Sequence, residues 1–328
     1  MNSGKAIFLM AMAGVTASSA DWLSVPGGTG PGKGKRVVLI SGDEEYRSEQ
    51  ALPQLARILA TRHGFDCTVL FAIDPKDGTI NPDRNDNIPG LDALDKADLM
   101  VLFTRFRNLP DAQMKHIVDY VESGRPIVAI RTATHAFNLT PGSTYARWSW
   151  NSKEWDGGFG RQMLGETWVA HHGKHKVQST RGIIAAGQER NPILRGIGNG
   201  AIWAPTDVYE VRLPLPEGTT TLVLGQVVEG MKESDAAAEG VVNDPMMPVA
   251  WTRSYRGARV FTTTMGSAQD LLNEAFRRLL VNACYWAVGL EGRIEVRSSV
   301  GLVGEYAPLA FGFGGAAKGV KPADLQVR

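Results

Sequence analysis

Ionisable side chains follow several apolar runs of this sequence, at positions where the strands of an α/β sheet would end. The run "GRPIVAI" (124–130), for example, leads directly into "RTATH" (131–135). The residues of this kind that could do chemistry are Asp43, Glu45, Arg105, Arg131 and His135. A carboxylate or histidine can move a proton, and an arginine can stabilise a developing oxyanion. These residue types therefore predict acid–base chemistry on a polar substrate, with Glu45 and His135 as catalytic groups.

Histidines provide a second candidate site. Four of the six lie within residues 135–175, and three of these form "HHGKH" (171–175). A histidine titrates near neutral pH, so His172 is a further candidate for the acid or base. A metal-dependent hydrolase is the alternative, because zinc is held by three or four such ligands. Its candidate ligands are His171, His172, His175 and Asp43. The glycine inside this segment disfavours a helix that presents two histidines on one face, so no metal ion or other cofactor is expected.

Tryptophans are concentrated in the same part of the chain. Aromatic faces bind sugar rings by covering their C–H groups. Half of the eight tryptophans lie in residues 137–175, namely Trp148, Trp150, Trp155 and Trp168. Trp155 is a candidate for substrate binding, as are Tyr209, Asp43, Arg105 and Arg131. The alternative is that the tryptophans anchor a long loop on the sheet; it is favoured for Trp168 and stays open for the others.

A sheet is needed to bring these residues together. Apolar runs that alternate with amphipathic segments predict strands at 35–42, 65–73, 97–103 and 125–130, and helices at 48–64, 109–124 and 271–289. Strands that are apolar throughout indicate a mainly parallel sheet with helices on both faces. Right-handed crossovers favour a flavodoxin-like order in which 65–73 lies at the edge, followed by 35–42, 97–103 and 125–130. Ligands bind at the carboxyl ends of such strands, so residues 137–175 are expected to form a rim there.

The ends of the chain are expected to differ from this domain, which spans 35–290. Residues 1–20 have a lysine, a short apolar run and a small-residue end, which predicts a signal peptide cut after Ala20 and an exported protein. The apolar run is too short to span a membrane. Residues 21–34 are rich in glycine and proline and predict a linker. Residues 291–328 are expected to form a C-terminal extension, and the tail from Gly301 is expected to lie on the surface or to be partly disordered.

Composition excludes some classes of protein. The formal net charge is +1 and no basic run is present, which argues against binding to nucleic acid. The two cysteines, Cys67 and Cys284, exclude a disulfide framework, and two separate buried thiols are favoured over one bridge. His63 and His116 lie in predicted helices and are expected at the surface. The oligomeric state is left open.

Several segments within 35–290 occur in a recognisable order. They include "RVVLISGDEEYRSEQALPQLARIL", "GGFGRQMLGETWVAHHGKHKV", "TDVYEV" and "MPVAWTRSYRGARVFTTTMG". Together they resemble the ThuA-like (trehalose-utilisation) family, with His135 and His172 at family positions. The resemblance implies a fold like that of class I glutamine amidotransferases, and a link to disaccharide catabolism through 3-keto sugars.

The resemblance does not extend to glutaminase activity. Amidotransferases carry a cysteine on the turn after the strand that corresponds to 125–130, and "AIRTATHAF" has none. Without a thiolate no thioester can form, so glutaminase activity is rejected. The expected function is an exported enzyme that acts on a sugar or 3-keto sugar as a hydrolase, lyase or isomerase. The alternatives are a non-catalytic carbohydrate-binding or structural module and the metal-dependent hydrolase.

Overall fold

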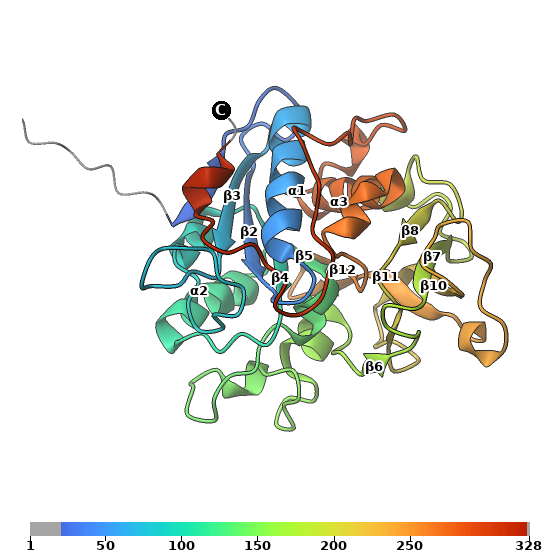
Figure 1. Ribbon diagram of the computed structural model, residues 1–328, viewed down its shortest axis with the longest axis horizontal. Coiled ribbons are helices and arrows are strands. Elements are labelled where there is room, and N and C mark those ends of the chain that lie inside the picture. Colours follow the sequence, from blue (N-terminus) through green and yellow to red (C-terminus); the bar gives the residue numbers. More distant parts are fainter. Residues whose placement is uncertain (1–20, 327–328) are drawn as a thin grey trace, which may run out of the picture.

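A ten-stranded mixed sheet forms the centre of the computed structural model, which describes residues 21–326 (Figure 1). Five neighbouring strands are parallel. In their order across the sheet they are β3 (Asp66–Phe71), β2 (Arg36–Gly42), β4 (Leu99–Thr104), β5 (Ile127–Ile130) and β12 (Ala258–Thr263). The predicted order of the first four strands is confirmed, and so is the α/β flavodoxin-like fold. The predicted signal peptide lies outside the described residues.

Antiparallel strands extend the sheet beyond β12. They are β11 (Met247–Tyr255), β10 (Thr220–Val228), β7 (Ser179–Ile184) and β8 (Ile202–Ala204). β11 and β12 form a hairpin in which Tyr255 pairs with Ala258. Its two loop residues, Arg256 and Gly257, both have positive φ angles (49° and 82°), as a type I′ turn requires. A separate two-stranded sheet pairs β6 (Ala170–His171) with β9 (Tyr209–Glu210).

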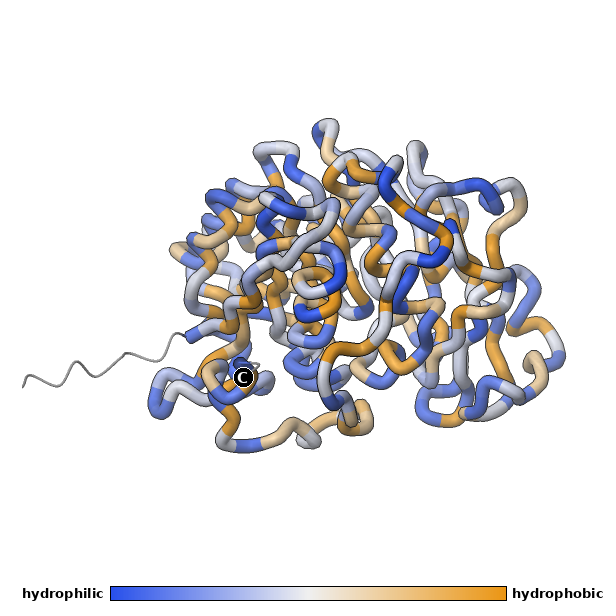
Figure 2. Tube along the Cα trace, turned by 90° about the horizontal axis from the view of Figure 1, so that it is seen from above, coloured by the Kyte–Doolittle hydropathy of each residue, from blue (hydrophilic) through white to orange (hydrophobic). Residues whose placement is uncertain are grey.

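Helices cover both faces of the sheet, as predicted. Side chains alternate between the faces of a strand. The face of β2 that carries Val37 and Leu39 packs in one core with α1 (Ser48–His63) and α3 (Glu274–Ala287). The other face, with Val38 and Ile40, packs in a second core with α2 (Asp111–Glu122). Figure 2 shows the hydrophobic stretches mainly inside the molecule and the hydrophilic ones mainly on its outer loops.

The predicted linker is partly a strand. β1 (Trp22–Val25) pairs antiparallel with β3, and Leu23 is buried in the core. Composition was misleading here because the glycines serve a close approach of two backbones. A Cβ on Gly27 would lie 2.3 Å from the carbonyl oxygen of Gly64, the residue that ends α1. Residues 21–34 are therefore packed on the domain.

The C-terminal extension also packs on the domain. In Figure 1 it crosses in front of α1, and Val300 and Phe311 are buried. Arg47 is itself buried, and its guanidinium donates hydrogen bonds to the carbonyl oxygens of Ala310 and Gly312. From Gly301 on, the extension runs over the surface of the domain, as expected, and is attached to it at Phe311 and through Arg47.

Two expectations about single side chains have different outcomes. Cys67 and Cys284 are free and buried, as favoured, and burial raises the pKa of both thiols. His63 is buried rather than exposed, and its Nδ1 is hydrogen-bonded to the Tyr285 hydroxyl at 2.9 Å.

None of the helices within residues 21–326 has the length and apolarity needed to span a bilayer.

Candidate functional site

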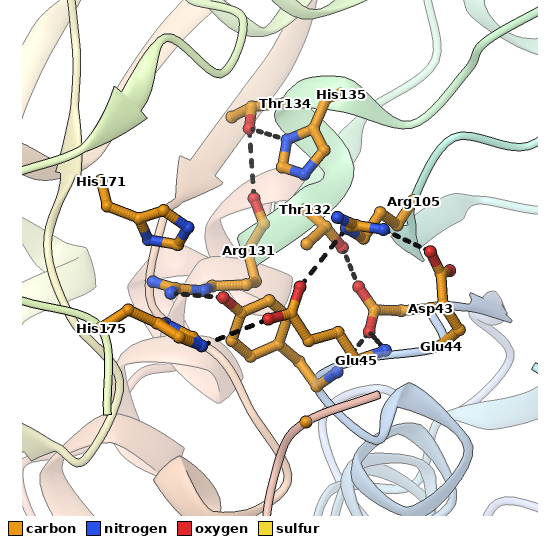
Figure 3. Close-up of polar contacts among 12 residues, drawn as sticks. Asp43, Glu44, Glu45, Arg105, Arg131, Thr132, Thr134, His135, His171 and His175 are labelled. Carbon is orange, nitrogen blue, oxygen red and sulfur yellow. Dashed lines mark hydrogen bonds and ion pairs between the residues drawn. The ribbon is translucent and has the colours of Figure 1, made fainter. Parts of the chain in front are cut away.

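A small cleft lies at the carboxyl ends of β2, β4 and β5 (Figure 3). It contains about 250 Å³ of empty space, which includes the solvent at its mouth. Its lining comes from several segments and consists of Glu45, Arg105, Phe106, His135, Trp168, His171 and Tyr209. Glu45, Arg105 and His135 converge as the sequence predicted. Residues 137–175 supply Trp168 and His171, so this segment does form part of the rim.

The turns that carry the site residues are strained. Arg47, Phe106 and Arg131 follow β2, β4 and β5, and each has a positive φ angle (61°, 48° and 48°). Such conformations cost on the order of 1–3 kcal/mol in a residue other than glycine, and they cluster at functional sites. Strain at three neighbouring strand exits agrees with a site at this edge of the sheet.

Arg131 lies beneath the cleft and is fully buried. Its guanidinium donates to the carbonyl oxygen of Thr264 (2.6 Å), to the carbonyl oxygen of Asp207 (2.8 Å) and to the Asp207 carboxylate (2.8 Å). The rings of Tyr46 and Tyr209 lie 4.4 and 3.8 Å from its central carbon. The predicted role of Arg131 in substrate binding is therefore wrong: the side chain is fully buried, and both of its terminal nitrogens donate to groups inside the protein, where they fix Asp207.

Asp207 orients a histidine toward the cleft. Its Oδ2 accepts a hydrogen bond from His171 Nδ1 at 2.5 Å. Burial acts to raise the pKa of Asp207, but the charge of Arg131 and the hydrogen bonds from His171 and His175 hold it well below its ordinary value. The carboxylate thus remains ionised. It fixes the tautomer of His171 that has its proton on Nδ1, which leaves Nε2 as an acceptor. Within residues 21–326 no protein group is hydrogen-bonded to that Nε2.

The predicted catalytic His172 does not face the cleft. Its Nε2 is hydrogen-bonded to the carbonyl oxygen of Val242 at 2.6 Å, and its backbone N–H donates to Val208. The reason is strand alternation. In the β6–β9 pair His171 lies opposite Tyr209, on the face that lines the cleft, so the next residue points elsewhere. The site histidine of this segment is therefore His171.

His175 carries a positive charge near Asp207. Its Nδ1 lies 3.2 Å from Asp207 Oδ1, and its Nε2 lies 3.4 Å from Glu45 Oε1. The hydrogen bonds to Asp207 and Glu45 raise the pKa of His175 to about 9. Burial acts to raise the pKa of Glu45, but the hydrogen bond from His175 and the charge of Arg105 bring it below its ordinary value. At neutral pH both side chains are charged.

This pairing predicts a pH-dependent stability. The pKa of His175 is higher in the folded state, so its contribution is complete below the unfolded value of about 6.5 and is lost as the pH rises through about 9. In urea unfolding at several pH values, we expect the wild type to lose more stability across this window than His175→Gln. Parallel pH profiles of the two proteins would contradict the assignment.

Arg105 supplies the positive charge in the cleft. Its guanidinium is paired with Glu44 and lies 3.5 Å from Glu45. The rings of Phe106 and Phe313 lie 4.6 and 5.0 Å from its central carbon. Phe313 belongs to the C-terminal extension, which therefore reaches the mouth of the cleft.

His135 is a neutral imidazole at the base of the cleft. It is almost completely buried, and its Nδ1 is hydrogen-bonded to the Thr134 hydroxyl at 3.1 Å. Burial, reinforced by the charges of Arg105 and Arg131, lowers its pKa well below the ordinary value. A neutral histidine here can exchange hydrogen bonds with a ligand without adding to the positive charge of the site.

Two predicted substrate-binding residues lie elsewhere. Asp43 is fully buried, where it accepts hydrogen bonds from the Thr132 hydroxyl (2.5 Å) and from the backbone N–H of Glu45 (2.8 Å). It shapes the turn after β2. Trp155 packs against Trp148 with ring centroids 5.8 Å apart and does not line the cleft. Residue type alone does not show that Asp43 accepts hydrogen bonds from the protein or that Trp155 packs against a second tryptophan. Both types also occur among residues that bind ligands.

Trp168 and Tyr209 line the cleft. Tyr209 was predicted to bind substrate, whereas Trp168 was expected to be an anchor. Its ring centroid is 5.6 Å from that of His135 and 5.9 Å from that of Trp150. Sequence reasoning missed Asp207 altogether. The only signal was an acid beside a very short strand, in "TDVYEV".

A divalent ion could be held by part of this site. One ligand atom from each of His171, His175 and Asp207 lies within 4.8 Å of the others. Asp43, predicted as a ligand, is bonded to Thr132 instead. Arg131, which lies 2.8 Å from Asp207, already neutralises this carboxylate and would repel a cation. The geometry therefore suits an aspartate–histidine pair better than a metal centre.

Comparison with known proteins agrees with this fold. The family model described as ThuA, trehalose utilisation, matches residues 36–287. A ThuA-like protein from Parabacteroides merdae has a TM-score of 0.50 and 16% identity, with 85% of this chain and 95% of that chain covered. A ThuA-like protein from Bacteroides uniformis has a TM-score of 0.51 and 15% identity, with 80% and 94% covered. No curated protein matches the sequence.

Proposed function

Because the chain belongs to the ThuA (trehalose-utilisation) family, we propose that it is an enzyme of carbohydrate metabolism that moves protons on a sugar or 3-keto sugar. One observation carries the proposal: buried Asp207 is bonded to His171 Nδ1, and the ring of His171 lines a cleft that also holds Arg105, Glu45 and His135. An oriented base beside a fixed positive charge is the arrangement that acid–base catalysis requires.

A keto group makes the adjacent C–H acidic, which gives each residue a role. His171 Nε2 takes the proton from this carbon, and the electron pair of the broken C–H bond moves onto the carbonyl oxygen. Asp207 stabilises the imidazolium that forms, as in other aspartate–histidine pairs. Arg105 stabilises the enolate oxygen. For an isomerase, His171 returns the proton to the same carbon, or to the former carbonyl carbon while the hydroxyl proton next to it moves to the former carbonyl oxygen. For a lyase, the enolate expels the leaving group from the next carbon, and His171 gives its proton to that group. Addition of water to the resulting double bond would make the net reaction a hydrolysis, so the three outcomes share the first step.

Solvent exchange tests the proposed step. The 3-keto forms of glucose and trehalose are incubated in D₂O with the protein, and deuterium at the carbons next to the keto group is followed by NMR. We expect exchange to be faster with the wild type than with buffer, and to fall back toward the buffer rate with His171→Ala. Binding of the sugars without faster exchange would favour the non-catalytic carbohydrate-binding module instead.

A metal-dependent hydrolase is the second candidate, and the closeness of His171, His175 and Asp207 favours it. In that function these three side chains would bind the ion, which would activate a water molecule. Metal analysis of the purified protein distinguishes the two candidates. One equivalent of a divalent ion that is lost in His175→Gln would support the metal site, whereas exchange that persists in EDTA would support the aspartate–histidine pair.

A further inference from the structure

Residues 310–315 lie beyond the part of the chain that the ThuA family model matches, which ends at residue 287. Their sequence is "AFGFGG", and they are called the strap below. The strap is bound to the turn after β2, which carries Glu45. Its Gly312 donates a backbone hydrogen bond to the carbonyl oxygen of Glu45 at 2.7 Å, and Arg47 donates to the carbonyl oxygens of Ala310 and Gly312. The strap is therefore fixed beside a residue that lines the cleft.

The two phenylalanines of the strap have different surroundings. Phe311 is buried, and its ring is stacked on that of Tyr46 with the centroids 5.6 Å apart. Phe313 is 64% exposed, which makes it the most exposed aromatic side chain within residues 21–326. Phe311 thus anchors the strap on the domain, whereas the ring of Phe313 contributes little to the core.

The exposed ring of Phe313 lies against the positive charge of the cleft. Its centroid is 5.0 Å from the central carbon of Arg105, and the centroid of Phe106 is 4.6 Å from the same carbon. Arg105 and Phe106 both line the cleft, so a ligand paired with Arg105 would lie within reach of Phe313. Contact with the apolar C–H face of such a ligand would remove part of the exposed ring from water, which is favourable.

We propose that Phe313 is a substrate-binding residue that covers the sugar held by Arg105, so that the strap completes the active site from outside the family domain. The inference rests on the proposed function, because it assumes that the cleft holds a sugar. Phe313 would contact the ring of the sugar, whereas Arg105 and His171 act on its carbonyl group and the adjacent C–H.

Deuterium exchange measures the test, with 3-keto-glucose as the probe. The exchange rate is followed against probe concentration for the wild type, Phe313→Ala, Phe313→Tyr and Leu309→Ala. Phe313→Ala is expected to raise the half-saturating concentration about tenfold. Its maximal rate should change by less than about threefold, because the ring contributes to binding and not to proton transfer. Phe313→Tyr keeps an aromatic face and should restore most of the binding.

Leu309→Ala is the matched control. Leu309 is an apolar side chain of the same extension and is 42% exposed, and its backbone N–H donates to Gln50 of α1 at 2.9 Å. We expect both kinetic parameters of this variant to stay within about twofold of the wild type. An equal rise of the half-saturating concentration in Leu309→Ala and Phe313→Ala would mean that any change in the extension disturbs the cleft, and would overturn the inference.

The two parameters separate the remaining outcomes. An unchanged half-saturating concentration in Phe313→Ala would show that the ring does not contact the sugar. If the maximal rate alone fell, Phe313 would act through the charge of Arg105, as a positioning residue. Both results overturn the inference and leave the proposed function intact, because the wild type still speeds exchange. If the wild type neither binds 3-keto-glucose nor speeds its exchange, the proposed function itself is wrong, and the inference is wrong with it.

Discussion

Replacing His171 with alanine is expected to lower the turnover of the true substrate by about 10²–10⁴-fold, the usual worth of one acid–base group. The variant loses the imidazole that Asp207 orients in the lining of the cleft, while the fold keeps its core because the His171 side chain is 36% exposed. The melting temperature should therefore change little. Turnover is measured on the substrate identified by exchange.

His172→Ala is the matched control for this prediction. The two histidines are neighbours in the sequence, but His172 is bonded to Val242 and lines no part of the cleft. We expect its turnover to stay within a few-fold of the wild type. The opposite result, in which His172→Ala loses turnover and His171→Ala does not, would return the catalytic role to the residue that the sequence favoured.

Replacing Asp207 with alanine is expected to affect both stability and activity. Arg131 would keep its charge in a fully buried position without its carboxylate partner. Breaking a buried ion pair from one side costs about 3–5 kcal/mol, so the free energy of unfolding should fall by that amount. His171 would also lose its orientation, so turnover should fall at least as far as in His171→Ala.

Urea unfolding followed by circular dichroism measures the loss of stability. Asp92→Ala is the control, because this aspartate is exposed on the surface and forms no salt bridge within residues 21–326. We expect its free energy of unfolding to change by less than about 0.5 kcal/mol. A loss for Asp207→Ala no larger than that of the control would mean that Arg131 is neutralised by another group. Asp207→Asn, which keeps the size of the side chain, tests activity if the alanine variant does not fold.

The sequence determined the parallel half of the sheet and its helices. The segments that became β2, β4 and β5 are almost entirely apolar, because a strand buried on both faces needs apolar side chains on each. Gly64 marks the end of α1 because its φ of 81° is unfavourable for other residues. These signals are local and locate the strands and helices. The order of the strands, and the edge of the sheet that holds the site, were predicted from general rules of chain connection.

The tertiary structure alone decided which side chains reach the cleft. Glu45, Arg105 and His135 were found because each follows an apolar strand whose end is visible in the sequence. His171 lies in a strand of two residues, whose orientation is fixed by pairing with Tyr209 far along the chain. A shift of one residue in the pairing of this strand would turn His172 toward the cleft in place of His171. The local sequence does not determine this register.

The roles of the charged residues also depend on distant contacts. Arg131 follows a strand just as Arg105 does, yet it is buried because Asp207, Thr264 and two tyrosines enclose it. The C-terminal extension has the composition of a loose tail, but Arg47 binds its carbonyl groups and brings Phe313 to Arg105. Composition and periodicity report how each segment folds. Whether a side chain faces the cleft or the interior of the protein is determined by the segments that pack against it. These segments are distant in the sequence, so a local pattern does not identify them.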